Sequence, residues 1–354
     1  MIKVLVVEDS PVQQQLLTHI LSSDPGIEVI GVVESGEDSL KFLAHTKPDI
    51  IIMDIFLPKM NGYTATRIIM EKCPVPIIIV SSSFDPADVK KAFLALDAGA
   101  LTAMGKPVGL DHPDYHKRSN ELIQTTKLMS EVKVVRRWAR SKAKNTKPLK
   151  FPRVGAKPTP DDIKLVVFGA STGGPTVLRT ILSELPKDFP VPLLIIQHIS
   201  RGFLEGFREW LGNAAGIMVH IAQNREILLP SHAYLAPESV HLRMNSNCLI
   251  ELSNGVPEHG MCPSVSYTFR SVADVCGKRA IGVLLTGIGK DGAKELKLMR
   301  ERGAITIAQD MDSSTIHGMP GEAIKLGAAI HVLPPLRIAK TLVRLLYKGK
   351  ELKT

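Results

Sequence analysis

The chain has 354 residues, a length that suits two domains of ordinary size better than one. Its composition, 44% hydrophobic and 22% charged, is that of a globular protein, and no apolar run approaches the ~18 residues that a membrane-spanning helix needs. The net charge of +9 comes mostly from residues 109–164, where 14 Lys and Arg face 6 Asp and Glu, so no fold-sized basic surface for nucleic acid is implied.

Short apolar runs alternate with amphipathic segments over residues 1–108. The runs have the length and β-branched content of strands, and the segments between them have the 3.6-residue period of helices. Five such units predict a parallel sheet with helices on both faces, in a doubly wound, flavodoxin-like α/β domain. The predicted strands are Ile2–Val7, Glu28–Val33, Ile50–Met53, Pro76–Val80 and Ala100–Met104, and the predicted helices are Gln13–Leu21, Glu37–His45, Tyr63–Glu71 and Ala87–Leu96.

The pattern changes after residue 108. Glu121–Arg140 is predicted to be a helix, because it carries one apolar stripe that includes Leu122, Leu128 and Val132. The following segment, SKAKNTKPLKFPRVGAKPTPDD, is rich in Lys, Pro and Thr and has no periodic pattern, which is typical of a linker. We therefore expect a first domain over 1–108, a basic linker with a helix over 109–162, and a second domain over 163–350.

The second domain begins abruptly with the apolar run IKLVVFGA. Further runs separated by longer helical stretches predict another doubly wound parallel sheet, in this case Rossmann-like, with an antiparallel insertion around 218–252. The predicted strands are Lys164–Phe168, Leu193–Ile196, His232–Ala236, Ala280–Leu285 and Ala304–Ala308.

The cysteines and the N-terminus bear on the cellular compartment. Cys73, Cys248, Cys262 and Cys276 show no CxxC spacing, so a metal cluster and a disulfide framework are both disfavoured. The N-terminal MIKVLVVEDS is too short and too acidic for a signal peptide. We expect a cytoplasmic protein with reduced thiols and no direct membrane insertion.

Charged and hydroxyl side chains follow the predicted strands of the first domain. Glu8 and Asp9 follow the first strand, Asp54 the third, Ser81 the fourth and Lys106 the fifth. Since ligands bind at the carboxyl ends of parallel strands, these side chains should converge on one edge. Carboxylates there would hold Mg²⁺, and one of them could accept a phosphoryl group that Lys106 and Ser81 then contact.

With DIFLPKMNG after Asp54 and GKP around Lys106, residues 1–108 resemble the response-regulator receiver domain. The resemblance implies a cis Lys106–Pro107 bond. The family usually has an aromatic residue three places before this lysine, and this chain departs from that pattern with Ala103. Signalling through a rotating aromatic ring is therefore not an expectation for this chain. The implied roles are phosphoacceptor for Asp54, Mg²⁺ site for Glu8, Asp9 and Asp54, and switch pair for Ser81 and Lys106.

The motif FGASTGGP, residues 168–175, directly follows the first strand of the second domain and has three interpretations. A Gly-rich turn before a helix could hold a pyrophosphate, but the next strand ends in Gln197 and His198 instead of the acidic residue that a dinucleotide site needs. A second interpretation makes Ser171 a nucleophile near helix N–H groups. The third is a structural turn.

The nucleophile interpretation needs a general base and an orienting acid. His198 ends the run PLLIIQH, and Asp291 lies in the Gly-rich loop after IGVLLTG, so both should lie at the same sheet edge as Ser171. Thr172 could orient the nucleophile or cap the helix. The competing bases are His220, His232, His241, His259, His317 and His331, and the competing acids are Asp310 and Asp312.

The motifs GASTGGP, LLIIQHI, LLTGIGKDGA, GAITIAQD and HGMPGEAI together resemble the protein-glutamate methylesterase of bacterial chemotaxis, the CheB family. The resemblance implies a Ser171–His198–Asp291 triad that hydrolyses glutamate methyl esters and also deamidates glutamines, without a cofactor for the ester chemistry. It implies two partners, a chemotaxis histidine kinase as phosphodonor and the cytoplasmic helices of methyl-accepting receptors. Nucleic acid is not an expected partner.

This chain departs from the family pattern at three positions near the expected substrate cleft. Cys262 stands where an arginine is usual, Ser266 where an acidic residue is usual, and Ile288 where a methionine is usual. Two other functions stay open, of which only the second follows from these departures. One is a DNA-binding regulator that uses the basic linker, although residues 163–346 are long for that role. The other is a catalytically inactive adaptor.

Overall fold

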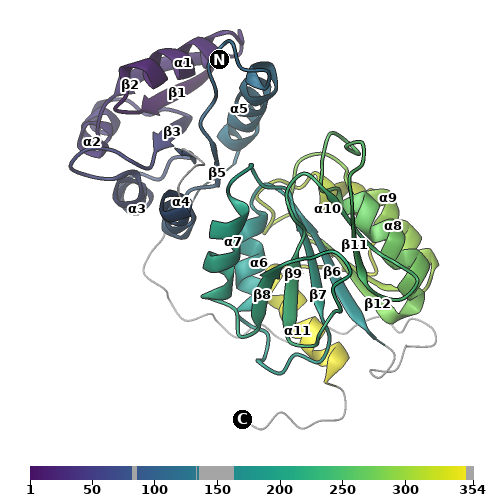
Figure 1. The fold of residues 1–354 in the computed structure, drawn as a ribbon. Helices are drawn as coiled ribbons and strands as arrows, with labels where there is room; N and C mark the ends of the chain where they lie inside the picture. Colours follow the sequence, from purple (N-terminus) through teal and green to yellow (C-terminus); the bar gives the residue numbers. More distant parts are fainter. Residues whose placement is uncertain (82–85, 133, 135–162, 348–354) are drawn as a thin grey trace. The chain divides into compact units, whose positions relative to one another are not determined.

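The computed structural model describes residues 1–81, 86–132, 134 and 163–347. The chain divides into two compact units, each with its own parallel sheet (Figure 1). Most of the expected basic linker, residues 135–162, lies outside the described residues. Among the described helices, none combines the length and the apolarity needed to cross a membrane.

The first unit is a five-stranded parallel sheet in the order β2-β1-β3-β4-β5. Helices α1 and α5 cover one face, and α2, α3 and α4 cover the other (Figure 1). This confirms the predicted flavodoxin-like arrangement. Its elements are β1 (Ile2–Val7), α1 (Pro11–Ser22), β2 (Ile27–Val33), α2 (Gly36–His45), β3 (Ile50–Asp54), α3 (Gly62–Lys72), β4 (Ile77–Ser81), α4 (Pro86–Ala98), β5 (Thr102–Gly105) and α5 (Tyr115–Ser130).

Helix α5 begins six residues before the predicted start at Glu121. Its first turn, Tyr115–Arg118, is polar, so the apolar stripe that marks the helix in the sequence starts only at Leu122. The helix packs against α1, β3 and β4, with Leu122 and Met129 buried. It is therefore a layer of the first unit instead of part of a free linker, while the exact domain boundary stays a prediction. The helix ends at Ser130, so the prediction that it continues to Arg140 is wrong at Glu131, Val132 and Val134, which are described and not helical; residues 133 and 135–140 lie outside the described residues.

The second unit is a seven-stranded parallel sheet in the order β14-β13-β12-β6-β7-β9-β8, with a separate antiparallel pair, β10-β11. This confirms the second parallel-sheet domain. Its elements are β6 (Leu165–Ala170), α6 (Gly174–Leu182), β7 (Leu193–Gln197), α7 (Leu204–Gly212), β8 (Met218–Ile221), β9 (His232–Leu235), β10 (His241–Met244), β11 (Ile250–Ser253), α8 (Val265–Cys276), β12 (Ala280–Leu284), α9 (Ala293–Glu301), β13 (Ile305–Gln309), α10 (Met319–Lys325), β14 (His331–Leu333) and α11 (Pro335–Leu346).

The predicted antiparallel insertion around 218–252 is only partly correct. Strands β10 and β11 are antiparallel, but β8 pairs in parallel with β9 and extends the main sheet. The strand direction could not be predicted here, because four-residue strands such as β8 carry no signal that distinguishes a crossover from a hairpin.

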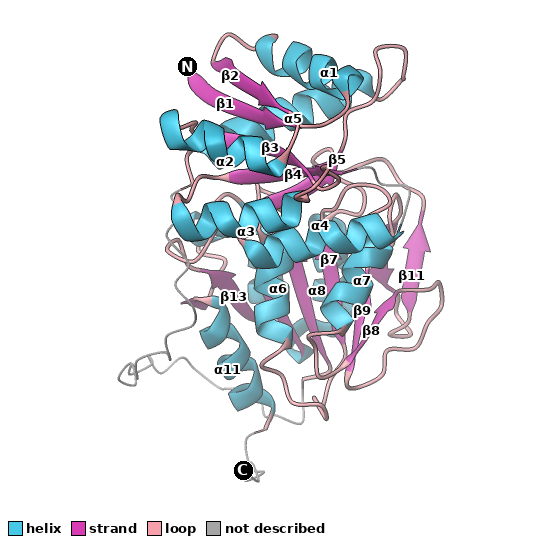
Figure 2. Ribbon diagram, turned by 90° about the vertical axis from the view of Figure 1, so that its left-hand side faces the viewer, coloured by secondary structure: helices cyan, strands magenta, loops and turns pink. Residues whose placement is uncertain are grey.

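Helices cover both faces of the larger sheet. Figures 1 and 2 show α6, α7 and α11 over one face, and Figure 1 shows α8, α9 and α10 over the other. Strand β6 lies at the centre of the sheet, between β7 and β12. The chain adds β7, β8 and β9 on one side of β6, and it later adds β12, β13 and β14 on the other side. Loops after these three central strands meet at the topological switch point, where open α/β sheets bind their ligands.

Candidate functional site

The strand register of the second unit places the predicted nucleophile beside the predicted base. Ala170 of β6 pairs with Gln197 of β7, so the next residues, Ser171 and His198, leave the sheet at the same level. The His198 N–H donates to the Ala170 carbonyl over 3.0 Å, and the Ser171 N–H donates to the carbonyl of Thr286, the loop residue after β12, over 3.0 Å. Three central strands therefore hold the two residues in place.

His198 and Asp291 form a buried pair. The Nε2 of His198 lies 3.0 Å from Oδ2 of Asp291, and their side chains are 7% and 3% exposed. The other ring nitrogen, Nδ1, is buried and has no hydrogen-bond partner among the described residues. With Nε2–H donating to Asp291, Nδ1 is the nitrogen that is left to act as a base. Among the described residues, Ser171 Oγ forms no hydrogen bond with the ring, and such bonds commonly tighten only when substrate binds.

The carboxylate of Asp291 sits at the N-terminus of helix α8. Its Oδ1 accepts hydrogen bonds from Ser264 Oγ and from the Ser266 N–H, both at 2.9 Å. Its Oδ2 accepts from the Val265 N–H at 2.8 Å, in addition to His198. Burial raises the pKa of Asp291, but the hydrogen bond and charge of His198 and the hydrogen bonding of Ser266 outweigh it, so that the pKa lies well below its usual range. Asp291 is therefore an anion at any pH near neutrality.

Two glycines shape the turn that carries Ser171. Gly173 has φ of +78°, a left-handed conformation that few other residues adopt, and a Cβ there would lie 2.3 Å from Thr315 Oγ1. Gly287 faces Ser171, and a Cβ on it would lie 2.7 Å from the Ser171 Cβ. Helix α6 has Gly173 as its N-cap and no side-chain cap, so the expectation that Thr172 could cap this helix is wrong.

Two backbone N–H groups of this turn can serve an oxyanion. Of the N–H groups over residues 171–174, that of Ser171 donates to the Thr286 carbonyl, and that of Gly174 donates to the Ser171 carbonyl over 2.8 Å. The N–H groups of Thr172 and Gly173 have no acceptor among the described residues. The candidate oxyanion donors therefore narrow to these two.

Sequence reasoning missed the side chains that brace the site. The buried Gln197 amide donates from Nε2 to the carbonyls of Ser171, at 2.8 Å, and His198, at 2.7 Å. The Thr286 hydroxyl donates to the Thr172 carbonyl at 3.0 Å. An amide or hydroxyl at the buried end of an apolar strand is the signal that could have identified both residues, because a buried polar group needs a partner.

Several of the histidines and aspartates that compete with His198 and Asp291 for the roles of base and acid make contacts with other residues. His220 and His232 stack on each other, with Nε2 and Nδ1 3.0 Å apart, on the edge strand β8 and its neighbour β9. His241 is buried, and its Nδ1 accepts the Ser264 N–H at 3.3 Å. The Asp310 carboxylate accepts from Ser313 in its own loop. Of the described histidine and acid candidates, His198 and Asp291 are the pair joined at the sheet edge.

The three departures from the family pattern lie around this site. Cys262 precedes α8 in a cis bond to Pro263, and burial raises the pKa of its thiol. Ser266 lies in the first turn of α8 and is fully buried. Ile288 lies half-buried in the loop between β12 and α9.

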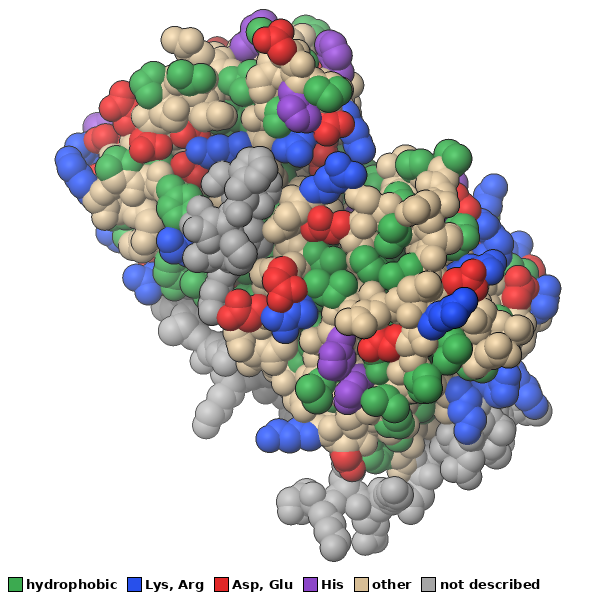
Figure 3. Space-filling view, in the orientation of Figure 1, with side chains coloured by type: hydrophobic (Ala, Val, Ile, Leu, Met, Phe, Trp, Pro, Cys, Tyr) green, Lys and Arg blue, Asp and Glu red, His purple; other side chains and the backbone are tan. Residues whose placement is uncertain are grey.

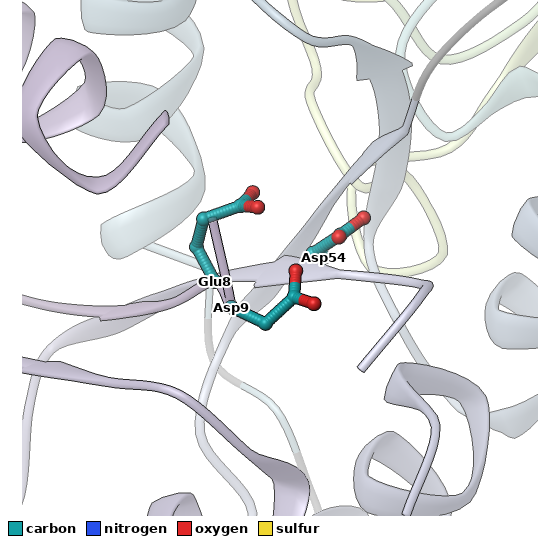
Figure 4. A group of neighbouring side chains, drawn as sticks. All are labelled: Glu8, Asp9 and Asp54. Atoms are coloured by element: carbon teal, nitrogen blue, oxygen red, sulfur yellow. The ribbon is translucent and has the colours of Figure 1, made fainter. Parts of the chain in front are cut away.

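The first unit brings its predicted residues together at the carboxyl edge of its sheet. Lys106 Nζ donates to Glu8 Oε1 and to Asp54 Oδ2, both at 2.9 Å. Carboxylate oxygens of Glu8, Asp9 and Asp54 lie within 4.8 Å of one another, and Figure 4 shows the three groups turned toward one region. Burial raises the pKa of Glu8 and of Asp54. For Lys106, burial lowers the pKa, but Asp54 and Glu8 outweigh it and the pKa is raised.

These residues fit a divalent cation and a phosphoryl group. Asp54 Oδ1 and the fully buried Ser81 Oγ have no hydrogen-bond partner among the described residues. A buried oxygen without a partner is costly, so both atoms are suited to a group that binds at this edge. The implied cis Lys106–Pro107 bond is wrong, since the cis bond among the described residues is Cys262–Pro263.

The face shown in Figure 3 bears on nucleic acid as a partner. Basic and acidic side chains are interspersed there on both units, in contrast to the one-signed stripe that a nucleic-acid-binding surface presents. The basic segment itself, residues 135–162, lies outside the described residues.

Comparison with known proteins finds relatives along the whole chain. The family model of the response regulator receiver domain matches residues 4–114, and that of the CheB methylesterase matches residues 166–342. A protein-glutamate methylesterase/protein-glutamine glutaminase 1 of Syntrophus aciditrophicus is 52% identical over 351 residues, which cover 98% of this chain and 98% of the relative. The corresponding protein of Nitrosospira multiformis is 50% identical, covering 100% and 99%. Among solved structures, the Thermotoga maritima CheB methylesterase catalytic domain matches with a TM-score of 0.50 at 34% identity, covering 52% of this chain and 98% of that domain.

Proposed function

We propose, since the chain belongs to the CheB methylesterase family, that it removes methyl esters from glutamate side chains of chemoreceptors, releasing methanol, and also deamidates receptor glutamines. Ser171 is the nucleophile, His198 the general base and Asp291 the orienting acid. The observation that carries the proposal is the buried His198–Asp291 pair, in which the His198 Nδ1 has no hydrogen-bond partner among the described residues and lies at the sheet edge beside Ser171.

Acylation begins when Ser171 Oγ attacks the carbonyl carbon of the ester and His198 Nδ1 takes the hydroxyl proton. The negative charge that develops on the carbonyl oxygen faces the N–H groups of Thr172 and Gly173. Asp291 stabilises the imidazolium that forms, through the bond to Nε2. The imidazolium then protonates the departing methoxide, so that methanol leaves and an acyl ester remains on Ser171.

Deacylation repeats these roles with water. His198 removes a proton from water, whose oxygen attacks the acyl carbon, and the proton then returns to Ser171 Oγ, which frees the glutamate carboxyl group. Deamidation differs only in its leaving group, because ammonia departs from a glutamine amide in place of methanol. In each step the proposed catalytic groups are side chains and backbone groups of this chain, and water is the second reactant.

The first unit regulates this reaction. Asp54 accepts a phosphoryl group from a chemotaxis histidine kinase, Lys106 pairs with the added charge, and the Ser81 hydroxyl donates to a phosphoryl oxygen. Glu8, Asp9 and Asp54 would hold Mg²⁺, which neutralises charge on the phosphoryl oxygens when bound. The chain exists in equilibrium between a repressed and an active state. Phosphorylation shifts this equilibrium by the difference between the interaction free energies of the phosphoryl group in the two states.

The substrate determines where the protein acts. Receptor helices that carry methylated glutamates lie on the cytoplasmic side, so we place the protein in the cytoplasm. The whole-chain match to proteins named for both methylesterase and glutaminase activity supports this substrate class. Which receptor and which glutamates it modifies depends on the surface near Cys262 and Ile288, whereas Ser266 is fully buried.

The test is methanol release from methylated receptor fragments by the full chain, with a small phosphodonor present. Ser171→Ala and His198→Ala should each remove nearly all activity, and the double variant should be little worse, because the residues act as a unit. An acyl ester on Ser171 should be trapped by quenching early in turnover. Near-normal methanol release by Ser171→Ala would show that the loop is a structural turn and would refute the proposal.

A further inference from the structure

Ser266, where this chain departs from the family pattern, lies in a chain of hydrogen bonds that ends at Asp291. Its N–H donates to Asp291 Oδ1 at 2.9 Å, and its Oγ accepts the N–H of Gly292, the residue after Asp291, also at 2.9 Å. The same Oγ lies 2.7 Å from Oε2 of Glu295 on helix α9. Ser266 therefore holds both the side chain of Asp291 and the backbone that carries it.

The Ser266 hydroxyl has a single proton, so its partners fix its direction. A carboxylate can only accept, and therefore the hydroxyl donates to Glu295. Its lone pairs then face the Gly292 N–H, which can only donate. Without the Glu295 carboxylate, the proton would be free to point elsewhere, including toward Gly292, where it would oppose the N–H.

Glu295 is itself held from its other oxygen. Arg270 on α8 contacts Glu295 Oε1 at 3.4 Å and forms two bonds with Glu258, at 3.1 and 2.9 Å. The Glu295 side chain is 14% exposed, whereas that of Arg270 is 44% exposed. The Glu295 carboxylate thus lies on the side of α9 that faces α8, between the buried Ser266 hydroxyl and the partly exposed Arg270 guanidinium.

We propose that Glu295 is a positioning residue for hydrolysis, acting through Ser266 on the loop that carries Asp291. It fixes the Ser266 hydroxyl, which holds Gly292 and keeps the Asp291 carboxylate aligned with His198. This inference rests on the proposed function. It assigns no contact with substrate to Glu295, so its loss should change turnover and leave substrate affinity unchanged.

The test compares Glu295→Ala, Glu295→Gln and Ser266→Ala in the full chain with a small phosphodonor, with kcat expressed per folded molecule. Glu295→Ala should lower kcat about tenfold while KM stays within about twofold, since misplacing a catalytic group costs turnover. Glu295→Gln keeps an oxygen that can accept from Ser266 and should restore kcat to within about threefold of the native value. The rate at which a fluorophosphonate probe labels Ser171 should follow kcat.

Coupling between the two residues gives a second measure. Ser266→Ala should lower kcat by a similar factor, and the Ser266→Ala/Glu295→Ala pair should be no worse than either single variant. Glu301→Ala, on the exposed end of the same helix, is the matched control and should match the native enzyme. If Glu295→Ala proves too unstable to assay, Ser266→Ala and Glu295→Gln still test the link.

Several results would overturn this role. Native kcat in Glu295→Ala, a rise in KM in place of a fall in kcat, or additive losses in the double variant would each do so. A variant that only melts at lower temperature, with native kcat, would reduce Glu295 to a contribution to folding. The Ser171→Ala variant separates the two proposals: if it is inactive while Glu295→Ala is native, only the positioning role fails.

Discussion

Replacing Asp291 with asparagine should remove the charge of this carboxylate while keeping its shape. Oδ1 accepts from Ser264 Oγ and the Ser266 N–H, and Oδ2 accepts from the Val265 N–H and His198 Nε2. An asparagine has one oxygen and one NH₂ group, which can only donate. Whichever way the amide turns, its NH₂ meets two groups that were donating to the carboxylate.

The magnitude follows from these contacts. The Ser264 hydroxyl and the His198 ring can each change from donor to acceptor, but the N–H groups of Val265 and Ser266 cannot. One of these backbone groups is therefore left buried without an acceptor, which should lower the free energy of unfolding by about 1–3 kcal/mol. If the NH₂ faces His198, the ring also takes the tautomer whose Nδ1 carries the proton and cannot act as a base. Together with the lost charge, this should lower kcat by about 10³–10⁴-fold, or about 4–5.5 kcal/mol of barrier.

The loss should still be smaller than that of Ser171→Ala, because the nucleophile and base remain. The assay is methanol release from methylated receptor fragments, with unfolding followed by chemical denaturation in parallel. Asp310→Asn is the matched control, since Asp310 is the competing acid and, among the described residues, its carboxylate accepts hydrogen bonds only from Ser313 in its own loop. Full activity in Asp291→Asn with loss in Asp310→Asn would refute the assignment of the acid.

Acid stability gives an independent check on the same carboxylate. The pKa of Asp291 is lower in the folded chain than its unfolded value of about 3.9. The stability that it contributes is therefore complete above the unfolded pKa and is lost as pH falls below about 4 toward the folded pKa. Asp291→Asn should lack this part of the acid dependence. An identical loss of stability with acid in both proteins would mean that the carboxylate is not held as an anion.

Three further predictions concern regulation, substrate attraction and the hydrogen bonds that hold the site. Asp54→Asn should abolish the activation of methanol release by a small phosphodonor. A chain that starts just before β6 should release methanol faster than the unphosphorylated full chain, and equal rates for these two would exclude repression by the first unit. Neutralising Lys142, Lys144 and Lys147 should raise KM at low salt more than it lowers kcat, because receptor helices are acidic, and an unchanged KM would leave the linker as a tether. Gln197→Leu should lower kcat about tenfold with little effect on KM, since the Ser171 and His198 carbonyls lose their shared donor; native kcat would show that β6 and β7 alone hold the turn.

The sequence by itself was enough for the first sheet, for five of the seven strands of the second sheet, and for the polar residues that follow these strands. Apolar runs such as Ile50–Asp54 and Leu193–Gln197 are buried along their whole length, which a parallel sheet covered on both faces requires. Polar residues that directly follow such runs must leave the sheet at its carboxyl edge. For that reason the positions of Ser171, His198 and Asp54 could be predicted without any knowledge of their contacts.

Strand direction and helix limits were less predictable where the local signal is short. Strand β8 has four residues and β14 has three, too few to show a period from which their pairing could be predicted. The polar first turn of α5 shows no apolar stripe, although the helix packs on the first sheet. In each case tertiary packing decided what the local pattern left open.

Only the tertiary structure decided how Asp291, the proposed orienting acid, is held. Asp291 lies 25–27 residues from the α8 groups that bind it and 93 residues from His198, so no local pattern records these contacts. The buried carboxylate must fill its lone pairs with donors from whichever elements the fold brings near, here the N-terminus of α8 and the end of β7. Such bonds depend on the approach of separate elements, and that approach is set by the packing of the whole domain.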